Sequence, residues 1–336
     1  MFSLAGLASA SIPFPQIPGP GFDALNRPKL RANRPGASGP AERKRLNPSR
    51  PCWLLPWLAL GLAGCKGIAP PAMPDPLRVG VLPDQTRERL EAIYTPLVRY
   101  LGETLHVRAE LTIPASYEDL GERFHRRELD LAFFGGATFI AAERRDGAAP
   151  LVARTIDLHF TSIVIARQGI DGSFPDDFRG RSFVFGPRAS TSGHLMPRHF
   201  FAELPLTPEA FFKSVAYLEN HDAVIAAVLE GRADMGVVNG PVLRRRMAEG
   251  AVDPERFRQV WESPPYPDYV WAVQAALPTE ISLRLQEAFL GLDAANPEQA
   301  RILDALGTAA YLPATRASFA PIRQALPAQP AHAPSP

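Results

Sequence analysis

Hydrophobic and polar positions alternate in a regular way from residue 77 onward. Short apolar runs, such as LRVGVL at 77–82 and LDLAFF at 129–134, are typical of buried strands. Between such runs, apolar residues recur with helical spacing, for example at positions 90, 93, 94, 97, 98 and 101. The pattern predicts strands at 77–82, 106–113, 129–134, 161–167, 181–186, 214–218, 233–238, 257–263 and 269–277, and helices that include 90–101, 116–128, 137–145, 221–231, 279–291 and 297–307.

Strands that alternate with helices at this spacing predict an α/β fold in which helices cover both faces of a mostly parallel sheet. The alternation occurs twice, so we expect two lobes, one at 77–160 plus 270–325 and the other at 161–269. The strands at 161–167 and 269–274 are the expected hinge pair. Ligands in open α/β sheets bind beyond the carboxyl ends of the strands, and both lobes place loops there.

The first 64 residues have a different character. Residues 1–42 are rich in Pro and Gly without periodicity, and we expect them to be disordered or to follow from a misassigned translation start. A basic segment at 43–50 then precedes an apolar run at 53–62. Ten apolar residues are too few to span a bilayer, which needs about 20. The order predicts a secretory signal peptide at 43–64.

The signal peptide ends in Leu-Ala-Gly before Cys65, which resembles a bacterial lipobox. Cys65 is therefore the expected lipidation site, and residues 65–76 the tether that holds the protein off the membrane. The other cysteine, Cys52, would be removed with the signal, so no disulfide is expected. The prediction is a periplasmic, membrane-anchored lipoprotein. At the other end, residues 326–336 are expected to form a loose tail.

Charge and motif content exclude several classes of function. Residues 65–336 hold 28 basic and 33 acidic residues, a formal net charge of about −5, which does not suit a nucleic-acid binder. The seven histidines show no metal-type spacing with acidic residues, and Ser192-Gly193 is not a Gly-x-Ser-x-Gly nucleophile elbow. We therefore expect no catalysis, no metal, no cofactor and a monomeric chain.

Three hydroxyl residues, Ser190, Thr191 and Ser192, stand between a predicted strand and a helical segment, and Gly193 follows them. A helix N-terminus has unpaired N–H groups and attracts anions. Hydroxyls add donors, and glycine leaves room for a ligand. The run predicts either a site for a small oxyanion or simple helix capping, which needs only one hydroxyl.

Five segments, in this order, resemble the periplasmic phosphonate- and phosphite-binding proteins of ABC importers. The resemblance covers nearly all of 77–325 and implies a type II periplasmic-binding-protein fold whose lobes close over an anion and deliver it to an inner-membrane permease. The segments are ASYEDL (115–120), LDLAFFGGATFIAA (129–142), GPRASTSGHLMPRHF (186–200), ENHDAVIAAVLEGRADMG (219–236) and ESPPYPDYVWAV (262–273).

The resemblance implies that Ser190, Thr191 and Ser192 hold the oxyanion, supported by Tyr117 and His221. For Tyr117 the alternative is half-buried packing, and for His221 a partly exposed position at a helix start. Two further candidates come from the start of the helix at 137–145, where Gly136 and Thr138 offer donors, unless Gly135-Gly136 is only a tight turn.

Two departures from the family pattern bear on the ligand. Phe160 stands where aminoethylphosphonate binders have a ligand-facing tyrosine, and Pro241 where they have a glutamate for the amine. Asp268 matches their second amine-contacting acid if one gap is allowed. We therefore expect a ligand without an amine, such as phosphite, methylphosphonate or phosphate. Arg188 is expected to be solvated. An alternative function is that of a periplasmic oxyanion sensor, whose ligand-bound form would dock on a histidine kinase instead of a permease.

Overall fold

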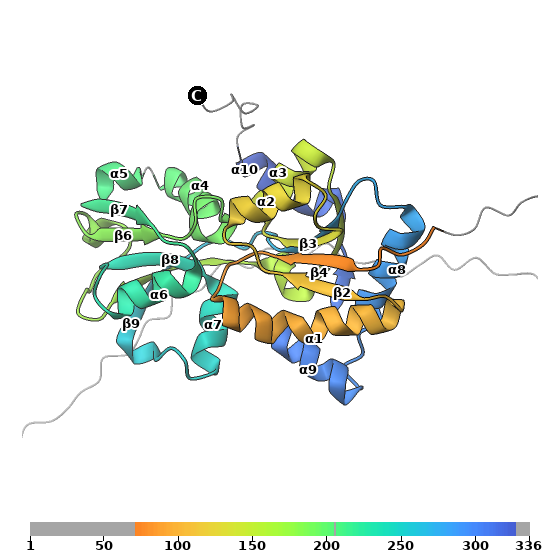
Figure 1. Ribbon diagram of the computed structural model, residues 1–336. Coiled ribbons are helices and arrows are strands. Elements are labelled where there is room, and N and C mark those ends of the chain that lie inside the picture. The colour runs from red at the N-terminus through yellow and green to blue at the C-terminus, as the bar shows by residue number, and fades with distance from the viewer. Residues whose placement is uncertain (1–70, 205, 327–336) are drawn as a thin grey trace, which may run out of the picture. The chain divides into compact units, whose positions relative to one another are not determined.

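The computed structural model describes residues 71–204 and 206–326 (Figure 1). The predicted signal peptide, Cys65, half of the predicted tether and nearly all of the predicted tail lie outside these residues. Every helix in the described part of the chain is too short or too polar to cross a membrane.

The first sheet of the described residues has six strands in the order β11-β4-β10-β3-β1-β2. Helices α1 and α9 lie on one side of it, and α2, α3 and α10 on the other (Figure 1). The strands are β1 (Leu77–Val81), β2 (Ala109–Thr112), β3 (Leu131–Phe134), β4 (Ala149–Arg154), β10 (Val270–Val273) and β11 (Tyr311–Pro313), and the helices are α1 (Arg87–Leu105), α2 (Tyr117–His125), α3 (Gly136–Asp146), α8 (Thr279–Leu290), α9 (Pro297–Leu306) and α10 (Ala320–Ala325).

The second sheet of the described residues has five strands in the order β7-β6-β8-β5-β9. Apolar side chains of α4 and α5 pack on one face of it, and those of α6 and α7 on the other. The strands are β5 (Ser162–Arg167), β6 (Ser182–Phe185), β7 (Ser214–Tyr217), β8 (Met235–Asn239) and β9 (Phe257–Glu262), and the helices are α4 (Met196–Glu203), α5 (Pro208–Phe211), α6 (His221–Leu229) and α7 (Gly240–Ala248).

Four short helical turns complete the chain between these elements, together with one π-helical turn described below. The 3-10 turns are η1 (Thr155–His159), η2 (Asp176–Phe178), η4 (Pro254–Arg256) and η5 (Arg316–Phe319). We call each sheet with its helices a lobe, the first and the second in chain order. The two-lobed α/β prediction is confirmed, whereas the exact lobe boundaries stay a prediction.

Each sheet is mixed, where the sequence predicted mostly parallel sheets. In the first sheet, β2, β1 and β3 are parallel, but β10, β4 and β11 pair antiparallel. In the second, β7, β6 and β8 are parallel, and β5 pairs antiparallel with β8 and β9. Antiparallel pairing follows because a strand that enters a lobe from the other one does not arrive through a helical crossover.

The chain crosses between the sheets through residues 155–161 and 263–269. The two segments are bridged by reciprocal backbone hydrogen bonds between Phe160 and Tyr266, 2.8 and 2.9 Å long. The expected hinge strands lie just beyond this bridge, because β5 belongs wholly to the second sheet and β10 to the first. The position of the hinge stays a prediction.

Several helices begin at the carboxyl ends of strands, with a polar residue or a glycine at the first turn. Ser116 and Asn220 cap α2 and α6 through their side chains, which places Tyr117 and His221 at the first helical positions. Asn239 caps α7 in the same way, and Gly135 precedes α3. These helix starts carry most of the predicted ligand residues.

Candidate ligand-binding site

The run from Ser190 to Gly193, which we call the hydroxyl loop, opens a π-helical turn, η3 (Thr191–Leu195), that leads into α4. π-helical turns are rare in proteins, and those that occur are often found at functional sites. The Ser190 hydroxyl accepts a hydrogen bond from the Gly193 N–H at 3.0 Å, so the capping prediction holds for this residue. Because the Ser190 hydroxyl oxygen is the acceptor in this bond, its own hydrogen is left to donate elsewhere. The three hydroxyl residues are buried.

Thr191 joins the hydroxyl loop to the first lobe. Its Oγ1 accepts a hydrogen bond of 2.9 Å from the backbone N–H of Ala137, in the first turn of α3. The backbone of Ser192 is held by Ser162, whose Oγ donates to the Ser192 carbonyl oxygen at 2.7 Å. Ser162 Oγ also contacts the Tyr266 hydroxyl at 2.6 Å. Both bonds leave the side-chain hydroxyls of Thr191 and Ser192 able to donate.

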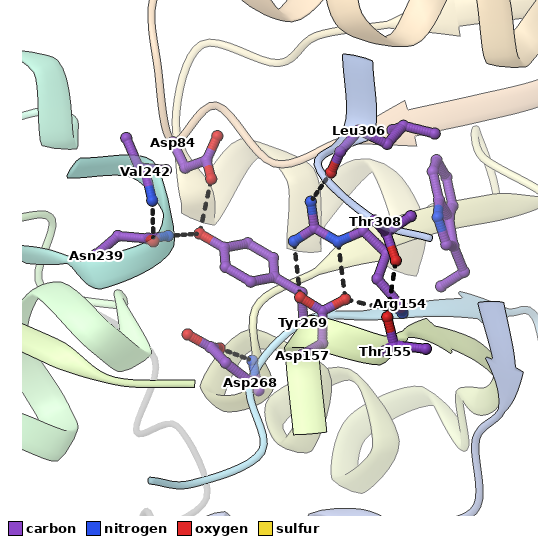
Figure 2. A network of polar contacts seen from close by, with 12 residues as sticks. Asp84, Arg154, Thr155, Asp157, Asn239, Val242, Asp268, Tyr269, Leu306 and Thr308 are labelled. Atoms are coloured by element: carbon purple, nitrogen blue, oxygen red, sulfur yellow. Dashed lines mark hydrogen bonds and ion pairs between the residues drawn. The ribbon is translucent and has the colours of Figure 1, made fainter. Parts of the chain in front are cut away.

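Asp268 lies on the crossing segment beside the start of α3 (Figure 2). Its Oδ1 accepts from the Gly136 N–H at 2.7 Å, while Oδ2 is buried with no hydrogen-bond partner among the described residues. Burial raises the pKa of Asp268 to about 7, against the opposing effects of the Gly136 N–H and the Thr191 hydroxyl. A buried carboxyl oxygen with no partner is costly unless something else donates to it.

Tyr117 is buried at the start of α2, and its hydroxyl has no partner among the described residues. Burial raises its pKa well above the usual value, the Asp84 carboxyl raises it further, and the neighbouring Ser190 hydroxyl lowers it. Tyr117 therefore stays neutral and keeps a hydrogen to donate. Because Ser190 is its neighbour, Tyr117 lies beside the hydroxyl loop and does more than fill space in the core.

His221 is fully buried at the start of α6, so the alternative of a partly exposed position does not hold. Its Nδ1 accepts from the Asn239 N–H at 3.3 Å, which puts the ring hydrogen on Nε2. Nε2 has no partner within the described part of the chain, and burial lowers the pKa of the ring to about 3. His221 is therefore a neutral donor.

Gly193 is what allows the histidine ring and the hydroxyl loop to meet. A Cβ on this residue would lie 2.9 Å from His221 Cε1, 2.9 Å from Ser190 Oγ and 3.2 Å from the Gly186 backbone. The structure thus brings together six of the eight predicted ligand residues around one loop, namely Tyr117, Ser190, Thr191, Ser192, His221 and Asp268.

The other two predicted residues have donors that are already engaged. The Thr138 hydroxyl is half-buried and donates to the Gly135 carbonyl at 2.9 Å. The Gly136 N–H donates to Asp268. Gly136 therefore holds Asp268 in place with its N–H. Gly135-Gly136 also begins helix α3, so it is more than a tight turn.

A chain of hydrogen bonds beside the site was not predicted from the sequence. Tyr269 donates to Asp84 Oδ2 at 2.7 Å and accepts from Asn239 Nδ2 at 3.0 Å (Figure 2). Asp84 follows β1 of the first lobe, Asn239 ends β8 of the second, and the Asp84 carbonyl accepts from the His221 N–H at 3.0 Å. Burial raises the pKa of Asp84 to about 6, and the bond from Tyr269 opposes this. The chain orients His221 from both lobes.

Phe160 and Arg188, which the sequence also singled out, lie in different surroundings. Phe160 is fully buried and packs on Tyr266 and Tyr269, with ring centroids 6.1 and 5.3 Å away. Arg188 is exposed, with its guanidinium 3.8 Å from the centre of the Tyr217 ring.

A hollow of about 300 Å³ lies between α1 and β2, but its lining includes none of the predicted ligand residues. No group of three or more His, Cys, Asp or Glu residues within 71–204 and 206–326 is arranged to hold a metal ion.

Comparison with known proteins agrees with this arrangement. The sequence profile of the family described as "ABC transporter, phosphonate, periplasmic substrate-binding protein" matches residues 79–319. The probable ABC transporter phosphite binding protein PhnD1 of Prochlorococcus marinus (strain MIT 9301) is 26% identical over 263 residues, which cover 75% of this chain and 89% of that protein. The phosphate-import protein PhnD of Mycolicibacterium smegmatis is 24% identical over 251 residues, covering 69% of this chain and 78% of that protein.

A solved structure of the Prochlorococcus PhnD1 in complex with methylphosphonate matches with a TM-score of 0.71 and 25% identity, covering 74% of this chain and 96% of that one. These relatives are binding proteins and not enzymes, as the sequence predicted. With the family profile matching over two lobes and the polar site between them, this chain belongs to the family of periplasmic substrate-binding proteins of phosphonate ABC transporters.

Proposed function

We propose that this protein binds a small phosphorus oxyanion without an amine, such as phosphite, methylphosphonate or phosphate, and delivers it to an inner-membrane permease. The observation that carries the proposal is the set of buried polar atoms around the hydroxyl loop. Tyr117 Oη and His221 Nε2 are donors without partners in the described residues, and the loop hydroxyls keep hydrogens to donate. Converging neutral donors suit an anion that loses its water on binding.

The absence of an amine follows from what surrounds these donors. An ammonium group needs several acceptors, preferably carboxylates, when it is buried. Phe160 presents only an aromatic ring, and Pro241 stands in the first turn of α7 where the resemblance would place a glutamate. Beside these donors, Asp268 Oδ2 is one acceptor oxygen that has no partner among the described residues. The relatives fit this choice, since one is named for phosphite, one for phosphate, and a solved structure holds methylphosphonate.

Delivery requires that the lobes respond to the ligand, and several contacts between them surround the site. Thr191 bonds to Ala137, and His221 bonds to Asp84. Farther out, Glu249 of α7 accepts from Arg89 of α1 at 2.6 and 2.8 Å. Such contacts form only when the lobes approach, so a ligand that bridges them would favour the closed arrangement.

Thermal denaturation of the chain from residue 66, with and without a panel of anions, tests this function. The panel is phosphite, methylphosphonate, phosphate, 2-aminoethylphosphonate and sulfate. A ligand at about 100 times its dissociation constant stabilises a protein by about 2.7 kcal/mol. We expect stabilisation by at least one amine-free phosphorus anion. Stabilisation by 2-aminoethylphosphonate alone, or by no member of the panel, would contradict the proposal.

The same panel ties binding to the hydroxyl loop through Thr191→Val. The change keeps the side-chain shape but removes the oxygen that accepts from Ala137 and donates toward the ligand. Loss of one hydrogen bond to a charged group costs about 1.5–3 kcal/mol, so the dissociation constant should rise about 10- to 150-fold. Titration calorimetry measures it. An unchanged constant would remove Thr191 from the site.

The proposed anchor is a lipid on Cys65, which lies outside the described residues. Cys65→Ala should leave ligand binding unchanged and move the protein from the membrane fraction to the periplasmic fraction, because no acyl chain can then hold it. Cell fractionation followed by immunoblotting measures the distribution. Normal membrane retention of the variant would show that the anchor is elsewhere.

A further inference from the structure

The site has several hydrogen-bond donors and one unpaired carboxyl acceptor, and this acceptor identifies the protonation state of the bound ligand. Tyr117, His221 and the loop hydroxyls offer donors, whereas Asp268 Oδ2 is an acceptor, buried and without a partner among the described residues. A fully ionised oxyanion has only acceptor oxygens. It would satisfy the donors and leave two negatively charged oxygens facing each other at Asp268.

We propose that the site binds its oxyanion together with one proton, which is shared between Asp268 Oδ2 and one oxygen of the ligand. This rests on the proposed function and adds the protonation state of its ligand. Either the ligand carries the proton as P–OH and donates to the carboxylate, or the carboxyl carries it and donates to the ligand. The number of bound protons is the same in both cases.

The surroundings of Asp268 favour this arrangement over an amine at the same place. Its Oδ1 is already bonded to Gly136, so only one oxygen is left to accept, and the nearby phenol and aromatic groups of Tyr117, Tyr266 and Phe160 carry no charge. One P–OH group needs one acceptor, whereas an ammonium needs up to three. The hydroxyls of Thr191 and Ser192 lie near enough to the carboxyl to affect its ionisation, so the ligand oxygens and the carboxyl share these donors.

Other titratable groups near Asp268 do not change charge near neutral pH, with one exception. Burial raises the pKa values of Tyr117, Tyr266 and Tyr269 well above the usual range and lowers that of His221 to about 3, so these groups stay neutral. Asp157, which faces Asp268 from η1, is fixed in an ion pair with Arg154 at 2.7 Å. The exception is Asp84, whose carboxyl accepts a hydrogen bond from Tyr269.

Proton linkage in calorimetry provides the test. Titrations in two buffers with different ionisation enthalpies give the number of protons taken up on binding. At about pH 8.5, where phosphite is a dianion and Asp268 is ionised, wild type should take up about one proton per phosphite, and affinity should fall about tenfold per pH unit. Asp268→Asn should take up none, because its amide donates directly to the dianion. Glu122→Gln, which changes an exposed carboxyl paired with Arg145 outside the site, should keep the uptake of wild type.

Sulfate gives a second readout in the unaltered protein, because sulfate carries no proton near neutral pH. Only Asp268 can then supply the proton, so sulfate should bind below about pH 7 and lose about tenfold in affinity per pH unit above it. In Asp268→Asn this loss should disappear. Phosphite binding by wild type without proton uptake at about pH 8.5, or equal uptake by wild type and Asp268→Asn, would overturn the shared proton. Absence of any phosphorus-anion binding would instead overturn the proposed function.

Discussion

Replacing Gly193 with alanine should weaken binding of the oxyanion by about 100-fold or more while leaving most of the stability of the fold. The new methyl group would meet His221 Cε1 and Ser190 Oγ at 2.9 Å and the Gly186 backbone at 3.2 Å. The backbone cannot give way easily, so the histidine ring and the serine hydroxyl must move. Two displaced donors to a charged ligand cost about 3–6 kcal/mol together.

Calorimetric titration with the best anion of the panel measures the loss, and Gly121→Ala is the matched control. Gly121 lies inside α2, four residues after Tyr117, and a Cβ there would contact nothing within 4 Å. Alanine in a helix interior is favoured over glycine by roughly 0.5–1 kcal/mol, so this control should bind normally and unfold at the same or a higher temperature. If Gly193→Ala binds as tightly as Gly121→Ala, the meeting of His221 and Ser190 is not part of the ligand site.

The parts of the fold that the sequence predicted well are those decided by local pattern. The strands at 77–82, 129–134 and 233–238 and the helices at 279–291 and 297–307 all have counterparts within a few residues. Strand β4, by contrast, was not predicted. Its sequence APLVAR begins with Ala-Pro after a helix and shows no alternation. The strand forms because β10 and β11 pair with it from distant parts of the chain.

The candidate site divides in the same way. The hydroxyl loop and the helix starts at Tyr117 and His221 carry local signals, since a run of hydroxyls or a capping residue is visible in a few letters. Tyr269 gave no such signal, because its partners Asp84 and Asn239 lie 185 and 30 residues away. The sequence predicted Asp268 as a ligand residue, but only the structure shows that one of its carboxyl oxygens accepts a hydrogen bond from Gly136.

A buried ion pair holds the crossing segments next to this site. Arg154 donates to both carboxyl oxygens of Asp157 at 2.7 and 2.9 Å and to the Leu306 carbonyl at 3.0 Å (Figure 2). Asp157 is fully buried, and its backbone carbonyl accepts from the Asp268 N–H at 2.9 Å. The carboxylate of Asp157 outweighs the effect of burial and keeps the pKa of Arg154 above its usual value. The pair therefore stays ionised at the base of the site.

Asp157→Ala should lower the free energy of unfolding by about 3–5 kcal/mol, because it leaves the guanidinium of Arg154 buried without its carboxylate. For a chain of this size the melting temperature should fall by roughly 6–20 °C, which calorimetry or circular dichroism measures. Glu122→Ala is the control, since it breaks the exposed pair between Glu122 and Arg145. An exposed pair contributes about 0–1 kcal/mol. Equal changes in the two variants would mean that the buried pair contributes no more to stability than a surface pair, and that packing alone holds the crossing segments beneath Asp268.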